Sequence, residues 1–277
     1  MMRDKLTALS TLEIPALVDD LKRLMGICIT TGNPNHPLFD YFMEYERWPK
    51  LIRSNVPTPA MVIELALFAL SVDIFKDDWF EDTVRAYVRR RLNEPREVMG
   101  LLFEFRVGVH FLHQHKRVQW MPNMGSSSEF DLRVTTGSGT IVSVECTRKQ
   151  ESSSRLDDPK ELCHDIVRAL RDKRKQIAGR TDADSVASLV AVLIPEQVDL
   201  ERWRQIRRRF LHSRIEKLFD KDEFRIISGF AVVGNAPPTT TMLDSGKIAH
   251  DTDLLVLPFT NTNSHRPFPL DFSCALV

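Results

Sequence analysis

The stretch EFDLRVTTGSGTIVSVECTRK, residues 129–149, has the pattern of two β-strands joined by a tight turn. Apolar and polar residues alternate on both sides of TGSG, and its two glycines favour a reversal of the chain there. If the hairpin turns at this point, Asp131 and Glu145 are about equally far from the turn. We therefore expect these two acids to be neighbours across the paired strands.

The segments around this hairpin predict an α/β domain. Helical spacing of apolar residues is seen in three segments, residues 96–115, 160–179 and about 200–219. Apolar runs typical of strands are seen at residues 117–121, 185–195 and 224–234, and a turn-rich tail containing LLVLPF follows. The order is helix, three strands, helix, strand, then helix and strand again, which predicts a mixed central sheet flanked by helices.

The part before this domain has a different character. From residue 11 to about residue 92 the apolar spacing is helical, with breaks at GNPNHP and NVPTPAM. We expect an accessory bundle of three to five helices. The turn signal Asn93-Glu94-Pro95 ends it, so the predicted domains are residues 1–92 and residues 93–277.

Composition limits the possible settings of the protein. The chain has 38 basic and 38 acidic side chains, so its overall charge gives no sign of nucleic-acid binding. No secretory leader is expected, no run of eighteen apolar residues predicts a membrane span, and the four cysteines form no CxxC or CxxH pair. We expect a soluble protein with reduced cysteines in the cytoplasm, without a disulfide framework or a zinc site.

Basic residues are nevertheless concentrated in places. The concentrations are Arg85 with Arg89 to Arg91, Lys173 to Lys175, and Arg202 to Arg209. Each is interpreted either as a solvated helix face, which is the commoner case, or as a surface that holds phosphate groups.

Three acids in this order suit the binding of a hard divalent cation. Glu104 lies in a nearly all-apolar helix, and a buried carboxylate without a partner costs several kcal/mol. Asp131 and Glu145 repel each other unless a cation lies between them. Each acid by itself is better explained by exposure to solvent, whereas the three together favour a metal site. Carboxylates without Cys or His partners favour Mg²⁺ or Mn²⁺ over zinc.

The combination of Glu104 in a helix, Asp131, Glu145 in a VEC strand and a following helix with Lys and Gln resembles the PD-(D/E)XK nuclease superfamily. The resemblance covers roughly residues 96–195. It implies a restriction-endonuclease-like core, with Asp131 and Glu145 as ligands of Mg²⁺. It also implies that Glu104 is an outer or direct ligand, and that the carbonyl of Cys146 is an additional one.

The expected catalytic lysine is missing from its usual position in this pattern. The residue two positions after Glu145 is Thr147, which carries no positive charge. Two substitutes are open: Lys149 on the same strand face, or Lys173 on the inward side of the next helix. Gln176, one turn further, resembles the glutamine found on that helix in many relatives.

The resemblance implies a Mg²⁺-dependent endonuclease that hydrolyses phosphodiester bonds of DNA, with RNA as a weaker expectation. Bacterial restriction or phage defence is the setting that such enzymes suggest, and the N-terminal helices are expected to choose the target or to form a homodimer. The rival hypothesis is a catalytically inactive relative, marked by Thr147, that binds nucleic acid or a protein partner. A third is an α/β interaction protein without nucleic-acid contact.

Overall fold

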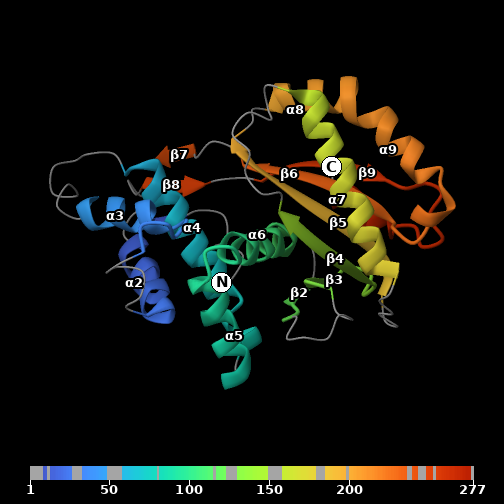
Figure 1. Ribbon diagram of the computed structural model, residues 1–277. Helices are drawn as coiled ribbons and strands as arrows, with labels where there is room; N and C mark the ends of the chain where they lie inside the picture. The colour runs from blue at the N-terminus through green and yellow to red at the C-terminus, as the bar shows by residue number, and fades with distance from the viewer. Residues whose placement is uncertain are drawn as a thin grey trace. The chain divides into compact units, whose positions relative to one another are not determined.

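The computed structural model describes residues 9–10, 13–26, 33–48, 58–79, 81–114, 117–122, 130–148, 158–178, 185–197, 200–235, 239–242, 248–251 and 254–275. The chain divides into two compact units. The first comprises residues 1–109 and 238–253, and the second comprises residues 110–237 and 254–277. The domain boundary expected at residue 92 stays a prediction. Figure 1 labels most of the helices and strands of both units.

The first unit is mainly helical. Its elements are α2 (Ile14–Met25), α3 (Phe39–Arg47), α4 (Ala60–Ile74), the 3-10 helix η3 (Lys76–Trp79), α5 (Asp82–Asn93) and the first part of α6 (Val98–Gln114). The helix α4 is apolar over most of its surface, and α2 and α3 both pack against it. A small antiparallel sheet adds the strands β1 (Leu9–Ser10), β8 (Ile248–Asp251) and β7 (Thr239–Met242), in that order.

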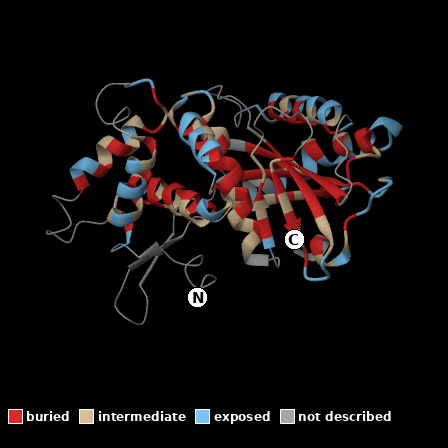
Figure 2. Ribbon diagram, turned by 90° about the horizontal axis from the view of Figure 1, so that it is seen from below, coloured by how far each residue is buried: buried red, intermediate tan, exposed pale blue. Residues whose placement is uncertain are grey.

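The second unit is built on a six-stranded mixed sheet. Its strand order is β2 (Arg117–Trp120), β3 (Leu132–Thr135), β4 (Ile141–Arg148), β5 (Ser185–Gln197), β6 (Gly229–Asn235) and β9 (Leu254–Thr260). The strands β4, β5 and β6 are parallel, whereas the other neighbours are antiparallel. Figure 2 shows the central strands buried along most of their length, which explains their nearly continuous apolar sequences.

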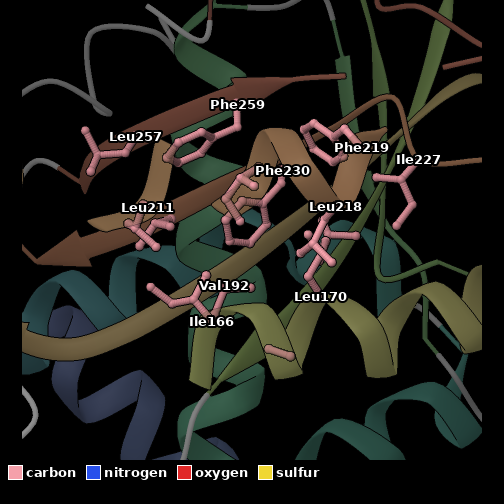
Figure 3. Packing of buried hydrophobic residues seen from close by; sticks show 14 of the residues in the cluster. Ile166, Leu170, Val192, Leu211, Leu218, Phe219, Ile227, Phe230, Leu257 and Phe259 are labelled. Carbon is pink, nitrogen blue, oxygen red and sulfur yellow. The ribbon is translucent and has the colours of Figure 1, made fainter. Parts of the chain in front are cut away.

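Helices cover one face of this sheet. They are α7 (Pro159–Ala178), α8 (Leu200–Ile206), the π-helix η4 (Arg207–Leu211) and α9 (His212–Phe219). Ile166 and Leu170 of α7 and Leu211 of η4 belong to the same buried cluster as Phe230 of β6 (Figure 3). The short helices η5 (Asp222–Phe224) and α10 (Leu270–Ala275) complete the unit.

The predicted mixed α/β architecture is confirmed, with three differences in detail. The helix expected over residues 200–219 is interrupted by the π-helix η4. The strand expected from residue 224 begins at Gly229, because Phe224 ends a 3-10 turn and is fully buried. The tail contains a strand, β9, whose pairing with the apolar strand β6 completes the sheet.

The hairpin predicted from residues 129–149 is present. The register pairs Leu132 with Val144 and Thr135 with Ile141. In the turn, Gly139 has a φ of 86°, a left-handed conformation that favours glycine. None of the helices in the described ranges is long and apolar enough to cross a membrane.

Candidate functional site

Asp131 and Glu145 occupy facing positions at the open end of the β3–β4 hairpin. One step beyond the last recorded pair, Leu132 with Val144, the antiparallel register places Asp131 opposite Glu145. The backbone N–H of Cys146 donates a hydrogen bond of 2.7 Å to Oδ2 of Asp131. The carboxylate of Asp131 is therefore held against β4 immediately beside Glu145.

Glu145 faces the helical layer. In the parallel register with β5, Glu145 pairs with Val190 and Thr147 pairs with Val192. Val190 and Val192 belong to the cluster that packs under α7, so the side chain of Glu145 lies on the same face of the sheet. Its exposed fraction is only 2%.

Lys173 of α7 reaches this buried carboxylate. Its Nζ lies 2.5 Å from Oε1 of Glu145, and the Lys173 side chain is 17% exposed. The apolar spacing that predicted an inward lysine is present in the structure, since Leu162, Ile166 and Ala169 are all buried. Of the two open candidates for the amine, Lys173 is thus the one that the structure brings to Glu145.

Of the remaining sequence-predicted residues of the hairpin and of α7, those that the structure describes differ in exposure. Thr147 lies on the same strand face as Glu145 and is partly exposed, whereas Lys149 lies outside the described residues. The side chain of Cys146 points to the opposite sheet face and is buried. Gln176, one turn beyond Lys173, is exposed.

Glu104 belongs to the first unit, where it is held by an arginine. Nη2 of Arg91 lies 2.9 Å from Oε1 of Glu104, and Nη1 lies 3.0 Å from Oε2. The side chains of Arg91 and Glu104 are 12% and 9% exposed. The partner that a carboxylate in an apolar helix needs is therefore provided within the unit by α5.

The side chains of Asp131 and Glu145 are of the ligand type that a hard divalent cation prefers. Asp131 and Glu145 offer carboxylate oxygens, which Mg²⁺ prefers, and Mg²⁺ is commonly held by one or two carboxylates together with water and substrate phosphates. Among the residues that the structure describes, no group of three or more His, Cys, Asp or Glu side chains is placed to hold a metal ion. Two facing acids are thus what this site provides.

The far end of the same hairpin is tied to the C-terminal helix, a contact that sequence patterns did not indicate. The backbone N–H of Ser138 donates a hydrogen bond of 2.9 Å to Oδ2 of Asp271 in α10. This bond is the main cause that lowers the pKa of Asp271. Because Asp271 lies 133 residues from Ser138 in the chain, only the tertiary fold reveals the contact.

The sequence placed Arg91 in a basic concentration but did not indicate that it pairs with Glu104. Comparison of the chain with protein-family models, with curated proteins and with solved structures gave no match.

Proposed function

We propose that this protein is a metal-dependent nuclease with a restriction-endonuclease-like core, which hydrolyses phosphodiester bonds of DNA. The observation that carries the proposal is that two acids lie opposite each other in the hairpin and that an amine contacts one of them. Asp131 and Glu145 face each other across the hairpin, and Lys173 contacts Glu145. The element order from α6 to β6 also agrees with the order predicted from the sequence.

In this proposal Asp131 and Glu145 bind the cation, Mg²⁺ or Mn²⁺. When bound, the ion would polarise the scissile phosphate and lower the pKa of a water molecule. Lys173 places a positive charge beside the same carboxylate, where it helps to neutralise charge that develops on the phosphate. Glu145 orients that amine, and its burial keeps bulk water away from the pair. Glu104, Lys149 and the carbonyl of Cys146 stay in the candidate set.

One observation favours the rival hypothesis, a catalytically inactive relative that binds nucleic acid or a protein partner. Glu145 is 2% exposed and already has a cationic partner in Lys173, so the charge of this carboxylate is balanced without a metal ion. Thr147 stands where the resemblance expects the lysine. An ion pair of this kind is equally suited to a purely structural role.

Cleavage of supercoiled plasmid distinguishes an active nuclease from the inactive relative. The full chain is incubated with MgCl₂, with MnCl₂ or with EDTA, and Glu145→Gln and Asp131→Asn are compared with the native protein. Glu223→Gln is the matched control. Glu223 forms an ion pair with Arg174 of α7, the helix that also carries Lys173, but Glu223 is 46% exposed.

We expect metal-dependent nicking that is retained in Glu223→Gln and falls at least 100-fold in both site variants. Cleavage that survives in Glu145→Gln or in EDTA contradicts the proposed site. Absence of cleavage on duplex DNA, single-stranded DNA and RNA, with binding retained, favours the inactive relative.

A further inference from the structure

The outward surface of α7 carries a row of basic side chains. Five exposed residues, each three or four positions after the one before, form this row. They are Lys160, His164, Arg168, Arg171 and Lys175. At 3.6 residues per turn these positions fall within an arc of about 80°. With a rise of 1.5 Å per residue the row is about 22 Å long.

No acidic residue of α7 falls within the arc of this row. The acids of α7, Glu161, Asp165 and Asp172, fall together on a neighbouring arc of the helix. Within the part of the chain that the structure describes, none of the row's side chains takes part in an ion pair. The chain has equal numbers of acidic and basic side chains, but this face of α7 carries basic ones.

The neighbouring π-helix extends this surface. Arg208 and Arg209 of η4 are exposed, and among the described residues neither takes part in an ion pair. Arg204 precedes them on α8, where it forms a long ion pair of 3.9 Å with Glu201. The π-helix lies directly against α7, because Sγ of Cys163 donates a hydrogen bond to the carbonyl of Phe210. Single-turn π segments often occur at functional sites.

The inner faces of α7 and η4 are buried in the hydrophobic core. Ile166 and Leu170 of α7 and Leu211 of η4 are buried against the sheet (Figure 3). The large exposed hydrophobic residues in the described ranges are Val186 and Leu270, and both lie outside these helices. A membrane-surface helix needs an accessible apolar face beside its basic residues, so this surface does not suit a lipid bilayer.

The form of the surface fits the backbone of a nucleic acid. A row of about 22 Å spans roughly six base pairs of a duplex, because base pairs follow each other at 3.4 Å along the axis. Five of the cations named on α7, α8 and η4 are arginines, whose planar forks bind phosphate oxygens through two hydrogen bonds. An extended array without interposed acids suits a continuous polyanion better than a single small anion.

We propose that the surface formed by Lys160, Arg168, Arg171 and Lys175 of α7 with Arg204, Arg208 and Arg209 of α8 and η4 binds the sugar–phosphate backbone of duplex DNA. Lys173 and Glu145 lie on the inner side of α7, so this surface is distinct from the candidate catalytic residues. The inference rests on the proposed function for its choice of nucleic acid among polyanions, but it does not require cleavage.

The test is binding of the full chain to a fluorescein-labelled 30-base-pair duplex in EDTA, measured by anisotropy from 50 to 300 mM KCl. The variants are Arg168→Ala/Arg171→Ala/Lys175→Ala and Arg204→Ala/Arg208→Ala/Arg209→Ala. The matched control Arg23→Ala/Arg47→Ala/Arg85→Ala removes three positive charges from the first unit, where these side chains are 77%, 71% and 56% exposed. Circular dichroism melting checks that each variant is folded.

We expect each surface variant to bind at least tenfold more weakly at 100 mM KCl, and the slope of log K against log[KCl] to become shallower by about 2 to 3. The control is expected to stay within twofold of the native protein. Equal loss in the control, native binding without salt dependence, or preferential binding to polyglutamate or phosphatidylserine vesicles overturns the inference.

The two proposals fail separately. If the native protein cuts no nucleic acid but the surface variants lose duplex binding, the nuclease proposal fails and the binding surface stands. If the native protein cuts plasmid and the surface variants bind as tightly as it does, only the binding surface is wrong.

Discussion

Lys173 and Glu145 form a buried ion pair between α7 and β4, with 2.5 Å between Nζ and Oε1 and exposed fractions of 17% and 2%. Because both charges are largely removed from water, each needs the other to compensate its desolvation. The pair therefore does two things at once. It fixes the helix to the strand, and it places an amine beside the carboxylate of the candidate site.

Replacement of Lys173 by methionine should destabilise the protein strongly. The variant leaves the Glu145 carboxylate buried without its cation, and we expect the free energy of unfolding to fall by about 3 to 5 kcal/mol. Urea denaturation followed by circular dichroism measures the loss. The double variant Lys173→Met/Glu145→Gln should recover much of it, because no charge is left buried.

Lys175→Met is the control for this substitution, because Lys175 lies on the same helix but is exposed. Its cost should stay within about 0.5 kcal/mol. A cost for Lys173→Met no larger than that of Lys175→Met contradicts the importance of the pair.

Asparagine and alanine at position 131 should differ in stability but not in cleavage. Asp131 accepts a hydrogen bond of 2.7 Å from the N–H of Cys146. Asparagine retains an acceptor there, whereas alanine removes it, so Asp131→Ala should cost about 1 to 3 kcal/mol and Asp131→Asn less. Both variants should lose cleavage, because a neutral side chain binds Mg²⁺ poorly.

Urea denaturation and the plasmid assay measure these two effects independently. Retained cleavage in Asp131→Asn counts against Asp131 as a metal ligand. Equal destabilisation by the two substitutions indicates that the hydrogen bond to Cys146 is not what holds the hairpin end.

The hairpin was predictable because its information is local. The glycines of TGSG and the alternation on either side set the register, so Asp131 and Glu145 fall opposite each other without reference to the rest of the fold. The inward direction of Lys173 was also predictable, because helical spacing places it among Leu162, Ile166 and Ala169.

Contacts between distant segments were not predictable in this way. The strand β9 is set by pairing with β6, and β8 pairs with both β7 and β1 in the first unit rather than joining the large sheet. Arg91 of α5 is paired with Glu104 of α6, and periodicity within one helix does not show which residue of another helix it will contact.

Acidification should destabilise the first unit through His36. This side chain is 3% exposed, its Nε2 lies 3.1 Å from the carbonyl of Leu92, and its Nδ1 accepts a hydrogen bond from the N–H of Leu38. The ring is therefore neutral with its proton on Nε2, and burial is the main cause that lowers the pKa of His36. Protonation of Nδ1 would place a second donor against the Leu38 N–H.

The direction of the pH effect follows from that lowered pKa. The unfolded chain takes up the proton first, near pH 6.5, so the contribution of His36 is fully present above that value and is lost as the pH falls toward the lower folded-state pKa. Urea denaturation between pH 7.5 and 5.5 should show a loss of at most about 1.4 kcal/mol per pH unit from this group. His36→Asn should flatten the profile, whereas His265→Asn, at an exposed position, should leave it unchanged. Identical profiles for the native protein and His36→Asn contradict this assignment.

Substitutions of Arg91 and Glu104 distinguish a structural pair from a metal-assisting carboxylate. Arg91→Met leaves a buried Glu104 without its cation and should cost about 3 to 5 kcal/mol. Glu104→Gln should cost less, because the amide oxygen still accepts a hydrogen bond from Arg91. Arg90→Met is the control, since Arg90 forms a similar two-bond pair with Glu97 but is 56% exposed, and its cost should stay below about 1 kcal/mol.

Cleavage by these variants, measured well below their melting temperatures, gives the functional result. The two hydrogen bonds between Arg91 and Glu104 place one guanidinium nitrogen on each carboxylate oxygen, so we expect the pair to act as a tie between α5 and α6. Glu104→Gln and Arg91→Met should then slow plasmid nicking by similar factors, and the Mn²⁺ concentration for half-maximal rate should not change. A rate that falls at least tenfold further in Glu104→Gln than in Arg91→Met, with a raised Mn²⁺ requirement, would instead assign Glu104 to the metal ion, because only the loss of the carboxylate would then matter.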